Sequence, residues 1–195
     1  MKQPIIIDTD PGIDDAAAIS IALNHPAFDL RMITTVNGNV EIEKTTANAL
    51  KLKQFFSSDV PIHRGASQPL LSNIVDASTV HGESGMNGYD FPEPNYNDLA
   101  SVHAVEAMYK ELKTNENPVT LIPIGPLTNI ALLLSTYPKA KDYIKEIVFM
   151  GGSAGRGNIT PSAEFNIYCD PEAAQIVFNS GLPLTMVGLD VARSS

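Results

Sequence analysis

The sequence has little of what a disulfide-linked, secreted or membrane protein needs. Its 195 residues include one cysteine, Cys169, which excludes an internal disulfide. The longest strongly apolar run, residues 130–134, is far short of the roughly 20 residues that cross a bilayer. Three consecutive isoleucines near the N-terminus are too few for the apolar region of a secretory signal. We therefore expect a cytoplasmic protein that does not bind a membrane.

Positive charge is also scarce. Lys and Arg number 13 against 22 Asp and Glu, which gives a formal net charge of -9. This balance disfavours nucleic acid and anionic membranes as partners, because both are themselves negative. A small neutral ligand or a cation fits better. With 44% hydrophobic residues the chain is long enough for one buried core, and we expect a single domain over residues 1–195.

Short apolar runs alternate with longer amphipathic or alanine-rich segments. This alternation predicts an α/β fold with an open, mostly parallel, Rossmann-like sheet and helices on both faces. The expected strands are residues 4–9, 30–36, 61–63, 118–124, 144–150 and 184–189, and the expected helices are residues 13–24, 41–56, 99–112, 127–135 and 171–179. The last strand has a buried type of sequence and no helix after it, so we expect a sheet that is incomplete at its C-terminal end. Residues 65–96 are too long for an ordinary connection and predict a functional loop.

Four aspartates crowd together where the first expected strand ends, and no Lys or Arg lies among them: Asp8, Asp10, Asp14 and Asp15. Open α/β sheets bind ligands at this end of their strands. Oxygen donors without Cys or His favour calcium or magnesium, and calcium suits irregular carboxylate sites best. The spacing is not that of an EF-hand, because Ile13 and Ile19 occupy the positions that need Gly and Glu. The alternative is that the acids only cap the helix and complement its dipole, but four such charges would raise one another's pKa.

A second polar cluster follows the strand expected at residues 144–150. Residues 151–158 are rich in glycine, but they match neither a Walker loop nor a dinucleotide-binding fingerprint. Asn158, Glu164 and Asn166 offer amides and a carboxylate, which are suited to sugar hydroxyls. In the long loop, His81 lies beside glycine and could act in acid–base work or stack on a base. Asp170 precedes a proline and is most simply a helix N-cap.

Four segments carry a resemblance to a known family: residues 8–16 (Asp-Thr-Asp-Pro-Gly-Ile-Asp-Asp-Ala), 80–85, 124–129, and 150–152 through 163–166. The sequence resembles the calcium-dependent nucleoside hydrolases, and among them the non-specific ribonucleoside hydrolases. The resemblance covers nearly the whole chain, and its first segment is the family's signature. It implies hydrolysis of purine and pyrimidine ribonucleosides to ribose and free base by a calcium-bound water, a place in nucleoside salvage, and assembly as a homo-oligomer.

The resemblance also implies roles for individual residues. Asp10 and Asp15 would bind Ca²⁺ together with the backbone carbonyl of Thr128, and Asp10 would also take a proton from the attacking water. Asp14 would bind the ribose 2′-hydroxyl, and Asp8 would be supporting structure. The other expected substrate-binding residues are Asn39, His81, Asn158, Glu164 and Asn166. The chemistry is consistent with these roles, because an oxocarbenium-like ribose favours anionic surroundings and bound calcium makes water more acidic.

The sequence departs from the family after residue 189. Family members draw a calcium-binding Asp and a His beside the leaving base from a later helix. Here no His follows His103, the last Asp is Asp190, and Ala192 stands where Thr is usual. We therefore expect a C-terminally truncated chain whose activity stays open, and we keep as an alternative a non-catalytic or weakly binding fragment. A second alternative is a haloacid dehalogenase-like phosphatase, which residues 7–10 resemble, although Gly12 stands where that motif has Thr or Val.

Overall fold

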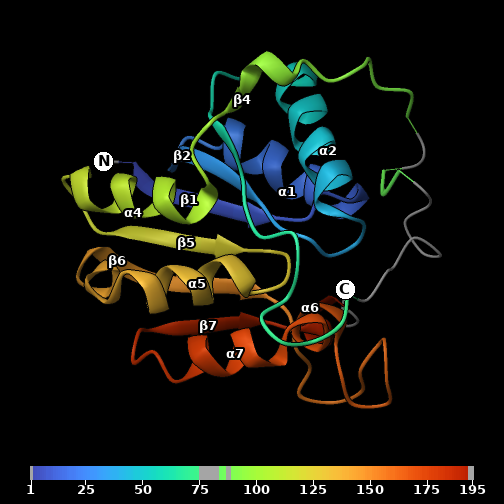
Figure 1. The fold of residues 1–195 in the computed structure, drawn as a ribbon, viewed down its shortest axis with the longest axis vertical. Coiled ribbons are helices and arrows are strands. Elements are labelled where there is room, and N and C mark those ends of the chain that lie inside the picture. The colour runs from blue at the N-terminus through green and yellow to red at the C-terminus, as the bar shows by residue number, and fades with distance from the viewer. Residues whose placement is uncertain (1, 75–83, 87–88, 193–195) are drawn as a thin grey trace.

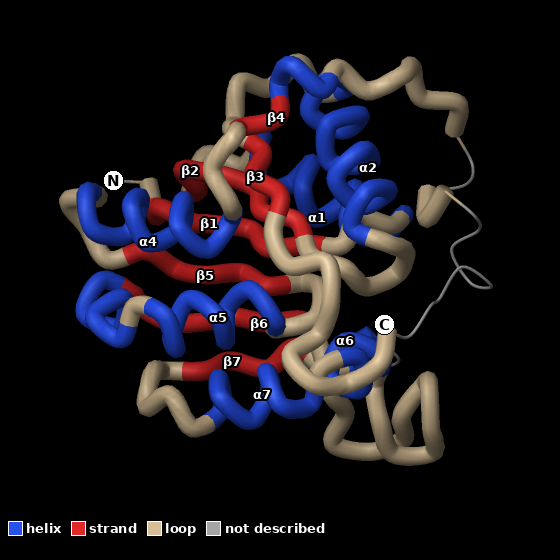
Figure 2. Tube along the Cα trace, in the orientation of Figure 1, coloured by secondary structure: helices blue, strands red, loops and turns tan. Residues whose placement is uncertain are grey.

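The computed structural model describes residues 2–74, 84–86 and 89–192, and its centre is one parallel sheet. In this part of the chain the strand order is β4-β3-β2-β1-β5-β6-β7 (Figures 1 and 2). All six neighbouring pairs are parallel. The strands are β1 (Gln3–Thr9), β2 (Phe28–Thr35), β3 (Ile62–Arg64), β4 (Leu99–Ala100), β5 (Val119–Pro123), β6 (Ile144–Met150) and β7 (Leu184–Val187).

Helices cover both faces of this sheet. Figure 2 shows α4, α5 and α7 side by side over one face. The helices are α1 (Ile13–Asn24), α2 (Ile42–Phe55), α4 (Ala104–Thr114), α5 (Thr128–Thr136), α6 (Phe165–Cys169), α7 (Pro171–Phe178) and α8 (Leu189–Ala192), with 3₁₀ turns at Tyr96–Asp98 and Pro138–Tyr143. None of the described helices is long and apolar enough to cross a membrane.

The central strand β1 explains why the core has two halves. Ile6 packs with residues of α4, α5 and α7, whereas Ile5 and Ile7 pack with residues of α1 and α2. Successive side chains of a strand point to opposite faces, so an unbroken isoleucine run fits a strand that is buried on both sides. The expected α/β class, with a mostly parallel sheet and helices on both faces, is confirmed.

Three local expectations were wrong. The helix expected from residue 99 begins at Ala104, because Leu99 and Ala100 pair with β3 and the ring of His103 accepts a bond from the Val105 N–H (3.3 Å). Helix α6 was not expected. The last strand ends at Val187 and is followed by the short α8, and Met186 is 45% exposed rather than buried because β7 is the outer strand of the described sheet.

Candidate functional site

Asp10 follows directly after β1 and lies in a space that two glycines leave open. The residue is only 1% exposed. A Cβ added to Gly38 would stand 2.0 Å from Asp10 Oδ2, and one added to Gly125 would stand 2.5 Å from Asp10 Oδ1. The loops after β2 and β5 therefore approach the two oxygens of this carboxylate closely, and only glycine fits at either position.

Asn39 fixes Asp10 with two hydrogen bonds. The Asn39 backbone N–H donates to Asp10 Oδ2 (2.6 Å), and the Asn39 side-chain amide donates to the Asp10 carbonyl (3.0 Å). Asp10 was expected to bind the metal and Asn39 to bind the ribose, and the fold brings the two residues into direct contact. Asn39 therefore holds both the backbone and the carboxylate of Asp10.

Asp15 and Asp14 lie in the first turn of α1, directly after the turn that ends β1. The carboxylate of Asp15 accepts bonds from the Thr9 hydroxyl (2.7 Å) and from the Gly12 N–H (2.9 Å). Asp15 is 5% exposed, whereas Asp14 is exposed to solvent. Asp15 is thus anchored inside the site, and Asp14 is open to a ligand.

Asp8 lies in β1, two residues before Asp10, and its side chain is bonded to other parts of the protein. Its Oδ1 accepts bonds from the hydroxyl of Thr34 (2.5 Å) and the amide of Asn129 (2.8 Å). Its Oδ2 is a buried atom with no hydrogen-bond partner among the described residues. Burial raises the pKa of Asp8 to about 7, against the lowering effect of the two hydrogen bonds.

The carboxylates at this end of β1 are close enough to repel one another. Their raised pKa values indicate whether a cation would be stabilising here. Burial, followed by the charge of Asp15, raises the pKa of Asp10 well above its ordinary value. Burial, followed by the charge of Asp14, raises the pKa of Asp15 to about 6. The ion pairs of the described residues include none of these acids. A bound cation would relieve both the burial cost and the repulsion, so the donor set fits calcium.

The carboxylate ligands of such a cation are few. Across the described segments, no three His, Cys, Asp or Glu side chains gather closely enough to hold a metal ion. Asp10 and Asp15 would need oxygens of other kinds, such as the Thr128 carbonyl, water or substrate hydroxyls, to complete the six to eight ligands that calcium takes.

Thr128, the first residue of α5, is held by a side-chain bond that the sequence did not predict. Its hydroxyl donates to Asp170 Oδ2 (2.7 Å), and both residues are buried. The next residue, Asn129, donates to Asp8 Oδ1 and to the Thr35 carbonyl (2.9 Å). The start of α5 is therefore tied to β1 and β2 on one side and to α7 on the other.

The polar cluster after β6 has largely structural hydrogen bonds. Glu164 caps α6 and accepts bonds from the N–H groups of Asn166 (2.9 Å), Ile167 (3.2 Å) and Gly152 (2.8 Å). The amide of Asn166 donates to the carbonyls of Ile124 (3.0 Å) and Met150 (3.1 Å), at the ends of β5 and β6.

Asn158 is exposed and accepts a bond from the N–H of Phe165 (2.9 Å). The charges of Asp10, Glu164 and Asp170 all act on buried Cys169, whose pKa is raised first by burial and then by these three acids. The acids that follow β1 and that precede α6 and α7 are thus all near enough to act on Cys169. The expected contacts of Asn158, Glu164 and Asn166 with a sugar stay predictions.

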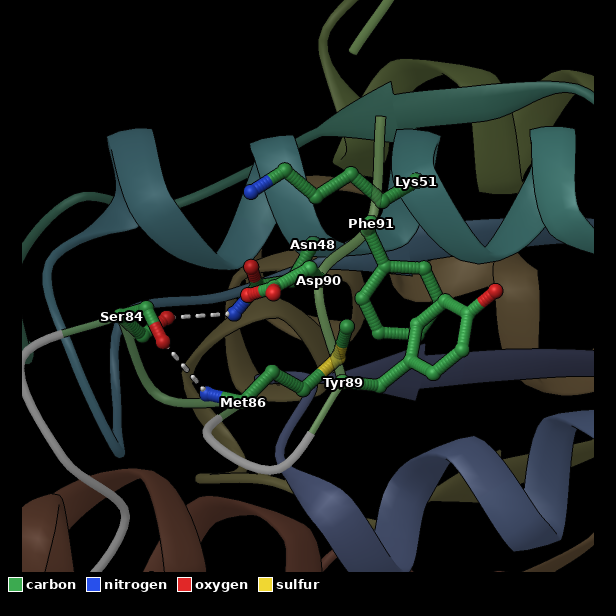
Figure 3. Close-up of a pocket in the computed structure, with 7 residues that line it drawn as sticks. All are labelled: Asn48, Lys51, Ser84, Met86, Tyr89, Asp90 and Phe91. Carbon is green, nitrogen blue, oxygen red and sulfur yellow. Dashed lines mark hydrogen bonds between the residues drawn. The ribbon is translucent and has the colours of Figure 1, made fainter. Parts of the chain in front are cut away.

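Asn48, on α2, connects the signature turn to the loop that was expected to carry His81. Its amide donates to the carbonyls of Pro11 (3.1 Å) and Ser84 (2.8 Å). Asn48 and Ser84 line a pocket of about 210 Å³ together with Lys51 and Phe91. Figure 3 shows Asn48 facing Ser84 in this pocket. His81 itself lies outside the described residues.

Asn48, Asn129 and Asp170 are the residues that sequence reasoning missed or took only as structural. Each is at most 2% exposed and carries a polar side chain, and each binds groups far away in the sequence. The available signal was a polar residue within or beside an apolar helix, such as Asn129 before Ile130-Ala131-Leu132. That signal shows burial but does not identify the partners.

Comparisons with known proteins find relatives over nearly the whole chain. A non-specific ribonucleoside hydrolase (RihC) of Klebsiella pneumoniae subsp. pneumoniae is 59% identical over 193 residues, which are 99% of this chain and 63% of the relative. The same-named protein of Escherichia coli (strain SE11) is 55% identical over 195 residues, 100% of this chain and 64% of the relative. The chain thus spans less than two thirds of the length of these relatives.

Solved structures show the same fold. A purine-preferring ribonucleoside hydrolase from Gardnerella vaginalis superposes with a TM-score of 0.91 at 35% identity, covering 96% of this chain and 61% of the other. An inosine-guanosine nucleoside hydrolase superposes with a TM-score of 0.92 at 33% identity, covering 100% and 64%. Residues 5–195 match the family described as inosine-uridine preferring nucleoside hydrolase. This chain therefore belongs to the inosine-uridine preferring nucleoside hydrolase family.

Proposed function

We propose that this protein hydrolyses the N-glycosidic bond of purine and pyrimidine ribonucleosides to ribose and free base, with calcium as its cofactor. The observation that carries the proposal is the pair of buried carboxylates, Asp10 and Asp15, whose burial and neighbouring negative charges call for a cation at the carboxyl end of β1. Membership of the nucleoside hydrolase family gives that cation site a substrate class. The reaction would serve purine and pyrimidine salvage.

The residues at this edge of the sheet divide the work of the reaction. Asp10 and Asp15, with the backbone carbonyl of Thr128, would hold calcium. When bound, calcium supplies orientation for the ribose diol and makes a water molecule more acidic. Asp10 would take the proton from that water, and Asp14, exposed beside it, would accept a bond from the ribose 2′-hydroxyl.

The remaining groups would bind the sugar and stabilise its developing charge. As the bond to the base breaks, positive charge grows on the ribose, and the carboxylates around it favour that state. Four residues would contact the other ribose hydroxyls, using the donor and acceptor atoms that are not taken up by bonds within the protein. They are Asn39, Asn158, Glu164 and Asn166. His81 would lie near the departing base.

The test is release of ribose from inosine and from uridine, measured with calcium and again after chelation. We expect turnover that disappears with the chelator and returns with added calcium. Asp10→Asn should reduce the rate by at least about 100-fold, because it removes the proton acceptor and one ligand. Asp142→Asn, which makes the same change at an exposed position, should keep the rate. Turnover that is insensitive to the chelator, or absent, contradicts the proposal for this chain.

A non-catalytic binding module is the second candidate, and one observation favours it. Two carboxylates rather than three form the described part of the cation site. Such a module would bind calcium and ribose weakly without cleaving nucleosides. Calorimetry separates the two candidates, since calcium binding without any turnover supports the module and measurable turnover excludes it. The family match gives no support to the haloacid dehalogenase hypothesis.

The setting of the protein is part of the same proposal. We propose that it acts in the cytoplasm, folds as one domain and assembles as a homo-oligomer, with a small ribonucleoside rather than nucleic acid or membrane as its partner. The net charge of -9 supports the choice of ligand, because it opposes binding to polyanions. Size-exclusion chromatography with light scattering would test the assembly, and a monomer would contradict it.

A further inference from the structure

Residues 65–74 form a strap (Figure 1, teal). It leaves the end of β3, passes the carboxyl ends of the central strands and contacts the start of α7. Near its start, the N–H of Ala66 donates to Asn129 Oδ1 (2.9 Å). Farther along, the N–H of Leu70 donates to Asp170 Oδ2 (2.9 Å), and the hydroxyl of Ser72 donates to Glu172 (3.1 Å). The strap is thus fixed at α5 and again at the start of α7.

Asp170 makes more bonds than a helix cap needs. Capping uses one oxygen, since Oδ1 accepts from the N–H of Ala173 (3.0 Å). The other oxygen, Oδ2, accepts from both the Thr128 hydroxyl (2.7 Å) and the Leu70 N–H. The side chain is completely buried, so each of the three hydrogen bonds that it accepts stabilises the structure more than the same bond would at the surface. One carboxylate thereby joins α7, the strap and the first residue of α5.

We propose that Asp170 is a positioning residue for the calcium site, acting by holding Thr128 in place through its hydroxyl. The inference rests on the proposed function, in which the Thr128 carbonyl is a calcium ligand. Thr128 begins α5, where fewer helix contacts restrain the chain than in the helix interior. A side-chain bond to a rigid, buried carboxylate fixes its backbone, and the Asn129 amide fixes the next residue from the opposite side. Groups that orient metal ligands in this way change metal affinity by about 10- to 100-fold when removed.

The test is the calcium affinity of the full chain and its variants, measured by titration calorimetry. Thr128→Val removes the hydroxyl but keeps the shape, so we expect calcium affinity to fall by about 10-fold or more. Thr128→Ser restores the hydroxyl and should bind calcium as tightly as the unaltered chain. Asp170→Asn should also lower the affinity, because its single amide oxygen cannot replace the two carboxylate oxygens that accept from Thr128, Leu70 and Ala173. The double variant Thr128→Val with Asp170→Asn should lose no more than either single variant, since both break one interaction.

A matched control separates positioning from general loosening. Ser72→Ala removes the other bond between the strap and α7 without touching Thr128, and it should leave calcium affinity unchanged. Unfolding in urea with a chelator reports any loss of stability separately from metal binding. If Asp170→Asn fails to fold, the Thr128→Val and Thr128→Ser pair decides the matter alone.

The possible results distinguish this inference from the proposed function. Calcium binding by the unaltered chain that is equally tight in Thr128→Val and Asp170→Asn overturns the positioning role and leaves the calcium site standing. No calcium binding by the unaltered chain overturns the calcium site, and the positioning role with it. Equal losses of calcium affinity in Thr128→Val and Ser72→Ala also overturn the inference. They would show that any loosening of the strap weakens calcium binding, whether or not it affects Thr128.

Discussion

The side chain of Asn39 donates a hydrogen bond to the backbone carbonyl of Asp10 while its own N–H binds the Asp10 carboxylate. A residue expected to contact ribose is therefore also part of the support for the metal ligand. The 3.0 Å bond has the usual length, and the 2.6 Å bond is short, as expected for an N–H that donates to a carboxylate. Binding of sugar and of calcium should consequently be coupled at this position.

Replacing Asn39 tests that coupling. In Asn39→Ala the backbone bond to Asp10 stays and the side-chain bond is lost, so the Asp10 backbone gains freedom. We expect calcium affinity to fall by about 10-fold, because the Asn39 side chain orients Asp10, a proposed calcium ligand. Calorimetry with calcium alone, in the absence of any nucleoside, measures this effect. A variant that binds calcium normally while losing ribose would limit Asn39 to the sugar.

The raised pKa values predict an unusual pH dependence for the metal-free protein. The folded-state pKa of Asp8 is about 7 and that of Asp15 about 6, both above the ordinary value of 3.8. The folded state therefore binds more protons than the unfolded state between these values, so the free energy of unfolding should decrease as pH rises from about 4 to about 7. Urea unfolding in the presence of a chelator measures it.

Asp8→Asn is the control for that measurement. The variant cannot ionise at residue 8, so the decrease with pH should become shallower, while calcium should still bind through Asp10 and Asp15. The raised pKa values are contradicted if the free energy of unfolding of the unaltered chain stays flat or rises over this pH range. They are also contradicted if Asp8→Asn leaves the dependence of that free energy on pH unchanged.

Gly38 should not tolerate a side chain. In Gly38→Ala the new Cβ would lie 2.0 Å from Asp10 Oδ2, so the carboxylate or the loop must move. We expect a loss of about 1–3 kcal/mol in the free energy of unfolding, together with weakened calcium binding. Gly155→Ala is the matched change, because its Cβ would lie 3.2 Å from its nearest neighbour, an oxygen of Asp190. Equal effects of the two changes would show that crowding at Asp10 is unimportant.

Asn129 should contribute strongly to stability. Its side chain bonds to Asp8, to the Thr35 carbonyl and to the Ala66 N–H, and the residue is completely buried. Asn129→Ala leaves these groups without partners, and we expect it to cost at least about 2 kcal/mol. Asn24→Ala removes an exposed local bond to Ser20 and should cost far less. Comparable losses in urea unfolding would refute the role of Asn129 as a central connection.

The sequence predicted the elements whose own residues determine them. Ile5-Ile6-Ile7 form β1 because a run of β-branched residues suits a strand buried on both faces, and the expected bounds of α1 match those observed. The clustering of Asp10, Asp14 and Asp15 also follows from local order, since the strand, turn and helix are consecutive. These features depend on neighbours in the sequence.

Features that depend on distant partners were not predicted. Asp170 has the sequence of a simple N-cap, yet two of its partners lie 42 and 100 residues away. Leu99 and Ala100 resemble the start of a helix, but pairing with β3 holds them as a short strand. The exposure of Met186 likewise depends on the place of β7 at the outside of the described sheet.

The central claim is that the buried carboxylates after β1 hold a divalent cation against the diol of a ribose. A crystal structure of the chain grown with calcium and ribose tests it most directly. We predict one calcium ion bonded to Asp10 and Asp15 at about 2.3–2.6 Å, with ribose hydroxyls among its other ligands. Carboxylates that remain bonded only to the protein, with neither ion nor sugar beside them under those conditions, would contradict the account.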